Sequence, residues 1–184
     1  YFVSNYTGKT QFAAVNLVMP FLMMMSVIGF MFGTGGNAIV SKLLGEGKNK
    51  KANEVFSMLV YITIIVGIVI FVAAEIAMPQ IAKLLGADKN MLEYCVLYGR
   101  IISISVTPFM LQVFFQSFMP TAGKPHIGLA VTIIAGVTNI ILDFLFVGVF
   151  KWGIVGAAAA TVTGESIGGI VPLVYFISKN SSSL

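Results

Sequence analysis

Charged residues are scarce in this chain of 184 residues. They make up 10% of the sequence, whereas an ordinary soluble domain carries about a quarter. Hydrophobic residues make up 58% of it. This balance excludes a typical water-soluble globular protein and indicates that lipid is the main solvent of the chain.

Cysteine and histidine are nearly absent as well. The single cysteine, Cys95, excludes an internal disulfide and a cysteine-based metal cluster, and small apolar packing explains it best. The single histidine, His126, follows TAGKP and has no ligand partner near it in the sequence, which argues against a metal site. The opening YFVSNYTGKTQ lacks the basic region and short apolar core of a secretory signal, and it is typical of the end of an earlier segment.

Long apolar runs separate the few charges. Each run reaches the ~20 residues that a helix needs to cross a bilayer, and none shows the short alternating segments of a membrane barrel. The sequence therefore predicts an all-α polytopic membrane protein with a bundle of about five transmembrane helices. We expect these helices near 11–41, 53–77, 92–121, 126–149 and 154–177. Residues 1–178 would form one membrane lobe, and residues 179–184 a polar tail.

The basic residues predict the orientation. Four of them lie between the first two spans, in SKLLGEGKNKKAN, so the positive-inside rule places loop 42–51 in the cytoplasm and the chain in the cytoplasmic membrane. The net charge of +4 is spread over such loops, which makes lipid headgroups the expected partners and argues against nucleic acid. Alternation puts Lys124 and Lys179 on the cytoplasmic side and Lys9, Lys83, Lys89 and Lys151 on the outer side.

One carboxylate, Asp143, stands inside the apolar run NIILDFLFVGV. It lies about seven residues from the FKWG turn, hence roughly 10–12 Å from the outer end of its helix. A charge at that depth costs ~2.5–3.5 kcal/mol on insertion scales, so the side chain should face the bundle or an aqueous cavity. The bland alternative is that Asp143 only bonds a neighbouring helix.

Helical spacing adds three polar partners. Asn139 lies one turn before Asp143, and an antiparallel turn centred on Trp152 pairs residues whose numbers sum to about 304. This predicts Thr161 opposite Asp143, and Glu165 opposite Asn139. Such oxygens can hold a proton or Na⁺, and we hypothesise that discharging the site biases the helices between two arrangements. For Glu165 two alternatives remain open: a bond to Ser166, or a position facing a helix outside this chain.

Glycine and proline predict how the helices pack. Gly29 and Gly33 form a GxxxG pair, which favours close packing, whereas a phosphate loop in GFMFGTGGNA is excluded by the lack of a βαβ unit. Pro20 and Pro108 are candidate bends in the first and third spans. The stretch MPFLMMMS admits two interpretations, contact with lipid or contact with apolar cargo.

Two further charges have ordinary explanations. Glu75 lies near the outer end of its span, where a carboxylate at headgroup level is expected. Arg100 should reach the same outer interface by snorkelling, as long basic side chains near helix ends do. Neither residue is therefore expected to take part in a binding site.

Four motifs in register resemble the multidrug and toxic compound extrusion (MATE) family over nearly the whole chain. They are GTGGNAIVSKLLGEGKNKKANEV, PTAGKPHIGL, NIILDFLFV and WGIVGAAAATVTGE. The resemblance implies helices two to six of a twelve-helix transporter, most of an amino-terminal lobe. It also implies an antiporter that exports cationic and amphiphilic compounds against Na⁺ or H⁺ entry, without a cofactor beyond that ion. Asn139, Asp143 and Thr161 match positions that help hold the ion, so Na⁺ at these three residues is a possible metal site.

Three departures from the family and three alternatives accompany this resemblance. The family's acidic residue on helix one would fall before Tyr1, the carboxy-terminal lobe is absent, and Glu165 replaces a frequent amide. The chain could be a flippase for lipid-linked saccharides, which would need several basic groups in its cavity. It could be an inactive membrane fragment. An intramembrane enzyme that uses Asp143 and Glu165 as acid and base is disfavoured, because the pairing sets them about a turn apart.

Overall fold

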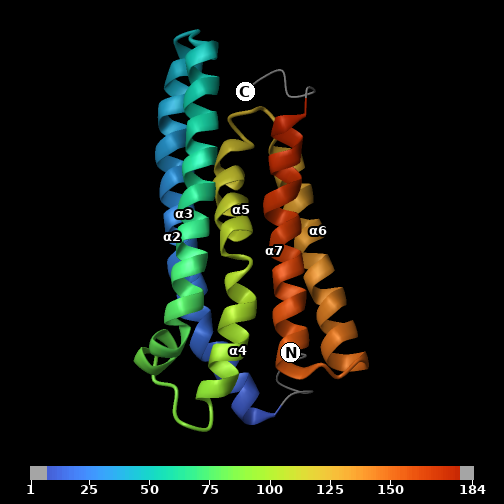
Figure 1. Ribbon diagram of the computed structural model, residues 1–184. Helices are drawn as coiled ribbons and strands as arrows, with labels where there is room; N and C mark the ends of the chain where they lie inside the picture. Colours follow the sequence, from blue (N-terminus) through green and yellow to red (C-terminus); the bar gives the residue numbers. More distant parts are fainter. Residues whose placement is uncertain (1–7, 179–184) are drawn as a thin grey trace.

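The computed structural model describes residues 8–178, which form a bundle of antiparallel helices (Figure 1). No strand occurs in this part of the chain, so the predicted all-α fold class is confirmed. The polar tail expected at 179–184 lies outside the described residues. The helices are α2 (Lys9–Gly45), α3 (Asn49–Leu84), α4 (Leu92–Ser103), α5 (Val106–Phe118), α6 (Pro125–Asp143) and α7 (Gly153–Ile177), and a π-helix, η1 (Phe144–Val149), continues α6.

The number of spans agrees with the sequence. Four helical segments, α2, α3, α6 with η1, and α7, are long and apolar enough to cross a membrane. Helices α4 and α5, between which the chain bends by 53°, make a fifth if the pair counts as one span. The first two helices are longer than predicted: α2 has 37 residues, about 55 Å, against a hydrocarbon core of about 30 Å. Hydropathy predicts only the part of a helix that lies in lipid. Both helices continue beyond that part into segments that contain polar residues.

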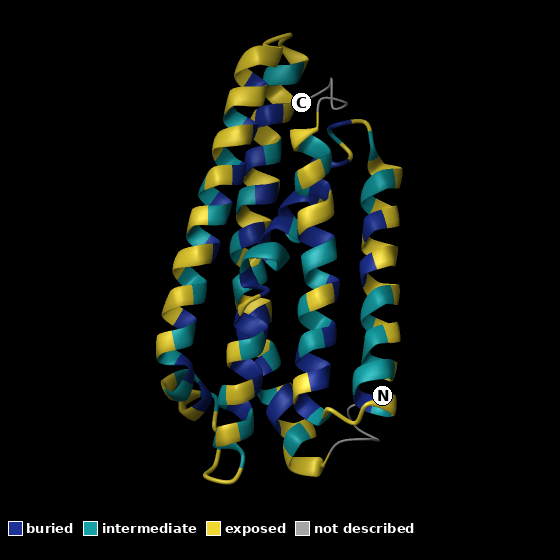
Figure 2. Ribbon diagram, turned by 45° about the vertical axis from the view of Figure 1, so that its right-hand side comes forward, coloured by how far each residue is buried: buried dark blue, intermediate teal, exposed yellow. Residues whose placement is uncertain are grey.

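Helix α5 lies at the centre of the bundle. It packs against α2, α3 and α7, whereas α6 packs mainly on α7 at the periphery. Figure 1 shows α2 and α3 side by side as one long hairpin, and α6 and α7 as a second hairpin. Large apolar side chains are exposed along the outer faces of both hairpins, as expected for surfaces that meet lipid (Figure 2). Among them are Met23 and Met24 of the methionine-rich stretch, and Met31 further along α2.

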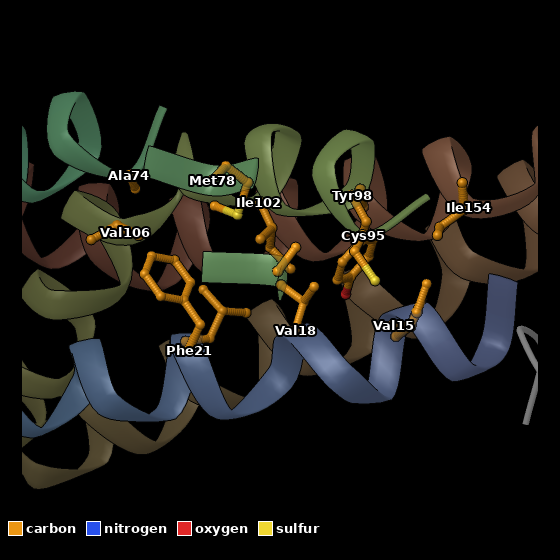
Figure 3. Close-up of a cluster of buried hydrophobic side chains, with 14 of the residues drawn as sticks. Val15, Val18, Phe21, Ala74, Met78, Cys95, Tyr98, Ile102, Val106 and Ile154 are labelled. Carbon is orange, nitrogen blue, oxygen red and sulfur yellow. The ribbon is translucent and has the colours of Figure 1, made fainter. Parts of the chain in front are cut away.

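Two buried clusters hold the bundle together. In the first, Val18 and Phe21 of α2 face Tyr98 and Ile102 of α4, with Met78 of α3 packed beside them (Figure 3). The second cluster is aromatic and joins α3, α5 and α7. Its rings stack or meet edge to face at centroid distances of 4.6–6.4 Å, and they belong to Phe56, Phe114, Phe115, Phe118 and Phe176.

Small residues on α2 bring its backbone close to α5. A Cβ added to Gly29 would lie 2.7 Å from the carbonyl oxygen of Met110, and one added to Gly33 would lie 3.1 Å from the Cα of Phe114. On the opposite side of α2, a Cβ at Gly35 would have nothing within 4 Å. The GxxxG pair therefore lies at the helix contact, whereas Gly35 faces open space.

The two prolines differ in their effect. Helix α2 continues through Pro20 without interruption. In the third span the helix breaks at Ile104 and Ser105, just before Pro108. A proline has no N–H to donate and its ring clashes with the carbonyl four residues earlier, here that of Ile104. The break therefore lies where the helix lacks the hydrogen bond from residue 108 to the carbonyl oxygen of Ile104.

The sequence suggested that Glu75 and Arg100 each reach the outer interface independently. In the structure the two side chains instead lie next to each other. The Nε atom of Arg100 lies 3.9 Å from Oε2 of Glu75, and both side chains are partly exposed. The pair joins α3 to the last turn of α4. A loose and partly exposed ion pair of this kind contributes little stability.

Candidate functional site

The hairpin of α6 and α7 aligns the predicted polar residues in depth. A Cβ added to Gly164 would lie 3.0 Å from the Cβ of Asn139 and 3.1 Å from the carbonyl oxygen of Ala135. Asn139 therefore faces Gly164, and this register agrees to within one residue with the pairing expected from a symmetric turn. The absence of a side chain at Gly164 allows the two helices to approach closely beside the polar residues.

Asp143 lies at the junction between α6 and η1. It is the last residue of α6, and the π-helical segment Phe144–Val149 begins immediately after it. Its side chain is partly buried, and its Oδ1 atom is buried without a hydrogen-bond partner among residues 8–178. A π-helical turn shifts the hydrogen-bonding register by one residue and is frequent at functional sites. The geometry thus leaves a carboxylate oxygen inside the bundle with its acceptor capacity unused.

Thr161 is linked to a residue that the sequence reading overlooked. Its hydroxyl donates to the carbonyl oxygen of Ala157 at 3.0 Å and also meets the phenol of Tyr98. Tyr98 comes from α4, is 1% exposed, and lies within electrostatic reach of both Asp143 and Glu165. No periodicity within the α6–α7 hairpin points to it, because it comes from another helix.

Glu165 does not bond Ser166 or Asp143. Its carboxyl group is hydrogen-bonded to the hydroxyl of Ser105, which is 0% exposed and lies at the break between α4 and α5. Ser105 is also hydrogen-bonded to the carbonyl oxygen of Ile102 at 2.8 Å. Of the four predicted residues, Thr161 therefore lies beside Tyr98, and Glu165 is bonded at the helix break. Asn139 faces Gly164, and Asp143 lies at the end of α6.

A cavity of about 360 Å³ lies between α5, α6 and α7, with Met19 of α2 at its edge. Glu165 is the only acidic or basic residue in its lining, and each of the other polar side chains there carries an amide or a hydroxyl group. One of them, Gln112, has a buried Oε1 atom without a hydrogen-bond partner in the described chain. The polar residues of the lining are Gln112, Thr132, Asn139, Thr161 and Glu165.

A second polar cluster joins two of the motifs at the other end of the bundle. The Oδ1 atom of Asn37 accepts hydrogen bonds from Thr121 at 2.5 Å and from Ser41 at 3.2 Å. The hydroxyls of Ser41 and Thr121 are themselves 3.3 Å apart. The motif GTGGNAIVSK of α2 is thereby tied to the motif PTAGKP that precedes α6.

The chain is similar to known transporters along nearly its full length. A multidrug export protein, MepA, of Staphylococcus haemolyticus is 31% identical over 99% of this chain, and MepA of Staphylococcus saprophyticus is 29% identical over 98% of it. This chain spans 40% of the length of each relative.

Solved structures agree on the fold. A crystal structure of MATE in the bent conformation superimposes with a TM-score of 0.92 over 100% of this chain and 41% of that one, at 20% identity. At that identity the likeness shows the fold alone. A model of the MatE family matches residues 1–145. Because this match covers more than half of the 184 residues, including the first three predicted spans and most of the fourth, the chain belongs to the MatE family.

Proposed function

We propose that this chain is part of an antiporter that exports cationic and amphiphilic compounds across the cytoplasmic membrane in exchange for Na⁺ or H⁺. The observation that carries the proposal is the Asp143 carboxylate, buried at Oδ1 without a hydrogen-bond partner among residues 8–178. Such a group is costly within a membrane unless it binds something. A cation or proton that enters and leaves is the partner that transport would supply.

The neighbours of Asp143 suit that role. Asn139 lies one turn away on the same helix, and Thr161 offers hydroxyl lone pairs beside Tyr98. Carboxylate, amide and hydroxyl oxygens are ligands for hard cations, and the carboxylate can also carry a proton. In this proposal Asp143 is the group whose charge changes, and Asn139 and Thr161 position the ion.

The lining of the cavity supports a cationic cargo. Glu165 is the only acidic side chain in the lining, and neither lysine nor arginine contributes to it. The anionic head of a lipid-linked saccharide would need basic partners, so the flippase alternative is less well supported. Met19 and Phe109 add apolar and aromatic surface, which fits an amphiphile.

Transport belongs to the whole protein in this proposal. The chain spans about two fifths of the length of the MepA relatives, which are named as multidrug export proteins. We expect a preceding helix and a carboxy-terminal lobe to complete the pathway, and no cofactor beyond the coupling ion. An antiporter requires no catalytic residue, so Asp143 and Glu165 are not assigned as acid and base of an enzyme.

The test replaces Asp143 by Asn in the complete reading frame that encodes this chain. We expect Asp143→Asn to abolish cargo uptake into inverted vesicles driven by an outward ion gradient, with the ion concentrated in the lumen, since the amide cannot gain or lose charge. Glu93→Gln is the matched control, because Glu93 is an exposed carboxylate of α4 and should leave uptake unchanged. Ion-driven uptake that survives Asp143→Asn at the wild-type rate would refute the proposal.

A further inference from the structure

The break between α4 and α5 is hydrogen-bonded to α7 through the side chain of Ser105. Ser105 sits at the start of α5, is completely buried, and contacts both the carboxyl group of Glu165 and the carbonyl oxygen of Ile102. Two glycines of α7 press on the same region: Gly169 lies against the backbone of Pro108, and Gly168 lies against the side chain of Gln112. The break therefore packs against α7, and Glu165 makes the hydrogen-bonded contact between them.

A count of hydrogens decides the protonation state that satisfies both contacts. A serine hydroxyl carries one hydrogen to donate and two lone pairs that accept. A carbonyl oxygen can only accept, so the contact with Ile102 uses the serine hydrogen. One hydroxyl hydrogen can be shared between two acceptors, but each contact has a hydrogen of its own only when Glu165 is a carboxylic acid.

The surroundings of Glu165 offer no cation that would hold it as a carboxylate. Helix α4 contributes Tyr98, which lies within electrostatic reach of Glu165. Tyr98 also lies within electrostatic reach of Asp143 of α6. From α2 and α5, the cavity receives only the uncharged Met19, Phe109 and Gln112. No ion pair of Glu165 occurs within residues 8–178.

We infer that Glu165 is a proton-binding site distinct from Asp143, and that its proton anchors the break by leaving the Ser105 hydrogen free to bond the carbonyl oxygen of Ile102. In the protonated form, Glu165 donates to Oγ of Ser105, and Ser105 donates to the carbonyl oxygen of Ile102. When the proton leaves to water in the cavity, the hydroxyl hydrogen turns to the carboxylate and the carbonyl of Ile102 loses its side-chain donor. The same proton therefore controls how firmly the break is held.

Infrared spectroscopy tests the proton directly. In the purified full-length protein at neutral pH, the carbonyl stretch of protonated carboxylic acids should contain a band from Glu165, and Glu165→Gln should remove that band. The band should keep its intensity but shift in frequency in Ser105→Ala, because the acid then has no serine to donate to. A spectrum unchanged by Glu165→Gln would overturn the inference.

Spin-label distances test the mechanical consequence. Labels at Leu97→Cys on α4 and Gln116→Cys on α5, both exposed positions, span the break once Cys95 is replaced by Ser. The distance distribution should be narrow at low pH and broader at high pH. Glu165→Gln should stay narrow at every pH, because its amide N–H donates to Ser105 as the acid does. Ser105→Ala should be broad throughout, which provides a readout if Glu165→Gln does not fold.

One further variant separates this inference from the proposed function. Asp143→Asn should retain the pH response of the label distance even though ion-coupled transport is lost. If wild type and Glu165→Gln respond to pH alike, the inference fails whatever the transport assay shows. If Asp143→Asn alone abolishes the response, the proton that controls the break belongs to Asp143 and the inference is again wrong.

Discussion

At the scale of single residues, Asn37 joins two parts of the chain that are far apart in sequence. Its amide oxygen accepts hydrogen bonds from Thr121 and Ser41, and the Thr121 bond crosses from α2 to the segment before α6. Both motifs contain amide and hydroxyl side chains, which contact with lipid does not require. A shared oxygen therefore explains why amide and hydroxyl groups occur at these positions.

We predict that Asn37→Ala lowers the stability of the purified chain by about 1–3 kcal/mol, because two hydrogen bonds are lost and two hydroxyls lose an acceptor. The measurement is the thermal unfolding midpoint in detergent. Ser41→Ala is the control, because it keeps the shorter bond between Thr121 and Asn37 and should cost less. Equal losses in both variants would show that the cross-link to Thr121 contributes nothing.

Depth in the membrane selected Asp143, and helical spacing selected Asn139, from the sequence alone. The roles of Ser105 and Tyr98 escaped that reading. The contact between Ser105 and Glu165 joins residues 60 positions apart, and spacing within one hairpin carries no information about a third helix. The sequence predicts Glu165 as an intramembrane carboxylate, but its partner depends on where the third span breaks.

At the scale of helices, the contact between α2 and α5 depends on missing side chains. Gly29 and Gly33 face the backbone of α5, and Gly36 faces Leu59 and Phe118. Without a hydrophobic driving force between helices in lipid, such close backbone approach is a main source of association. The α2–α5 contact should therefore respond sharply to added methyl groups on this face and little to those on the other.

We predict that Gly29→Ala destabilises the bundle by about 1–3 kcal/mol, because its Cβ would lie 2.7 Å from a backbone oxygen that cannot move away without moving α5. The measurement is again thermal unfolding in detergent. Gly35→Ala is the matched control on the same helix, where the Cβ meets open space. It should be neutral or gain up to about 1 kcal/mol from helix propensity. If both variants melt at the same temperature, this contact is not as tight as described.

Helix boundaries followed the sequence less closely than helix number. The five apolar runs located the spans, because the hydrophobic effect acts on each run as a whole. The π-helical turn after Asp143 was not predicted, since nothing in FLFVGV distinguishes six π-helical residues from six α-helical ones. Its register shift is a property of how η1 meets α7, and that depends on the tertiary packing.

At the scale of the whole molecule, the lysines lie at opposite ends of the bundle. The turn between α2 and α3, with Lys48, and the turn before α6, with Lys124, are at one end. The turn between α3 and α4, with Lys89, and the turn before α7, with Lys151, are at the other (Figure 1). This distribution fits the orientation that the positive-inside rule predicts, with loop 42–51 in the cytoplasm.

Cysteine labelling in intact cells checks this orientation. In a Cys95→Ser background, we expect Lys89→Cys to react with a membrane-impermeant maleimide and Lys48→Cys to be protected, because both positions are exposed but on opposite sides. Permeabilised cells should label both variants equally and thereby control for reactivity. Labelling of Lys48→Cys in sealed cells would reverse the assignment of inside and outside.

The length of the α2–α3 hairpin has a practical consequence for imaging. Its two arms, of 37 and 36 residues, extend past the end of the other helices, and the tip at Glu46–Lys48 is held only by local bonds (Figure 1). A rigid fiducial domain spliced into this tip would stand clear of the detergent belt and disturb none of the contacts that hold the bundle. Its helical stem would give a small membrane protein the alignment landmark that electron cryomicroscopy requires.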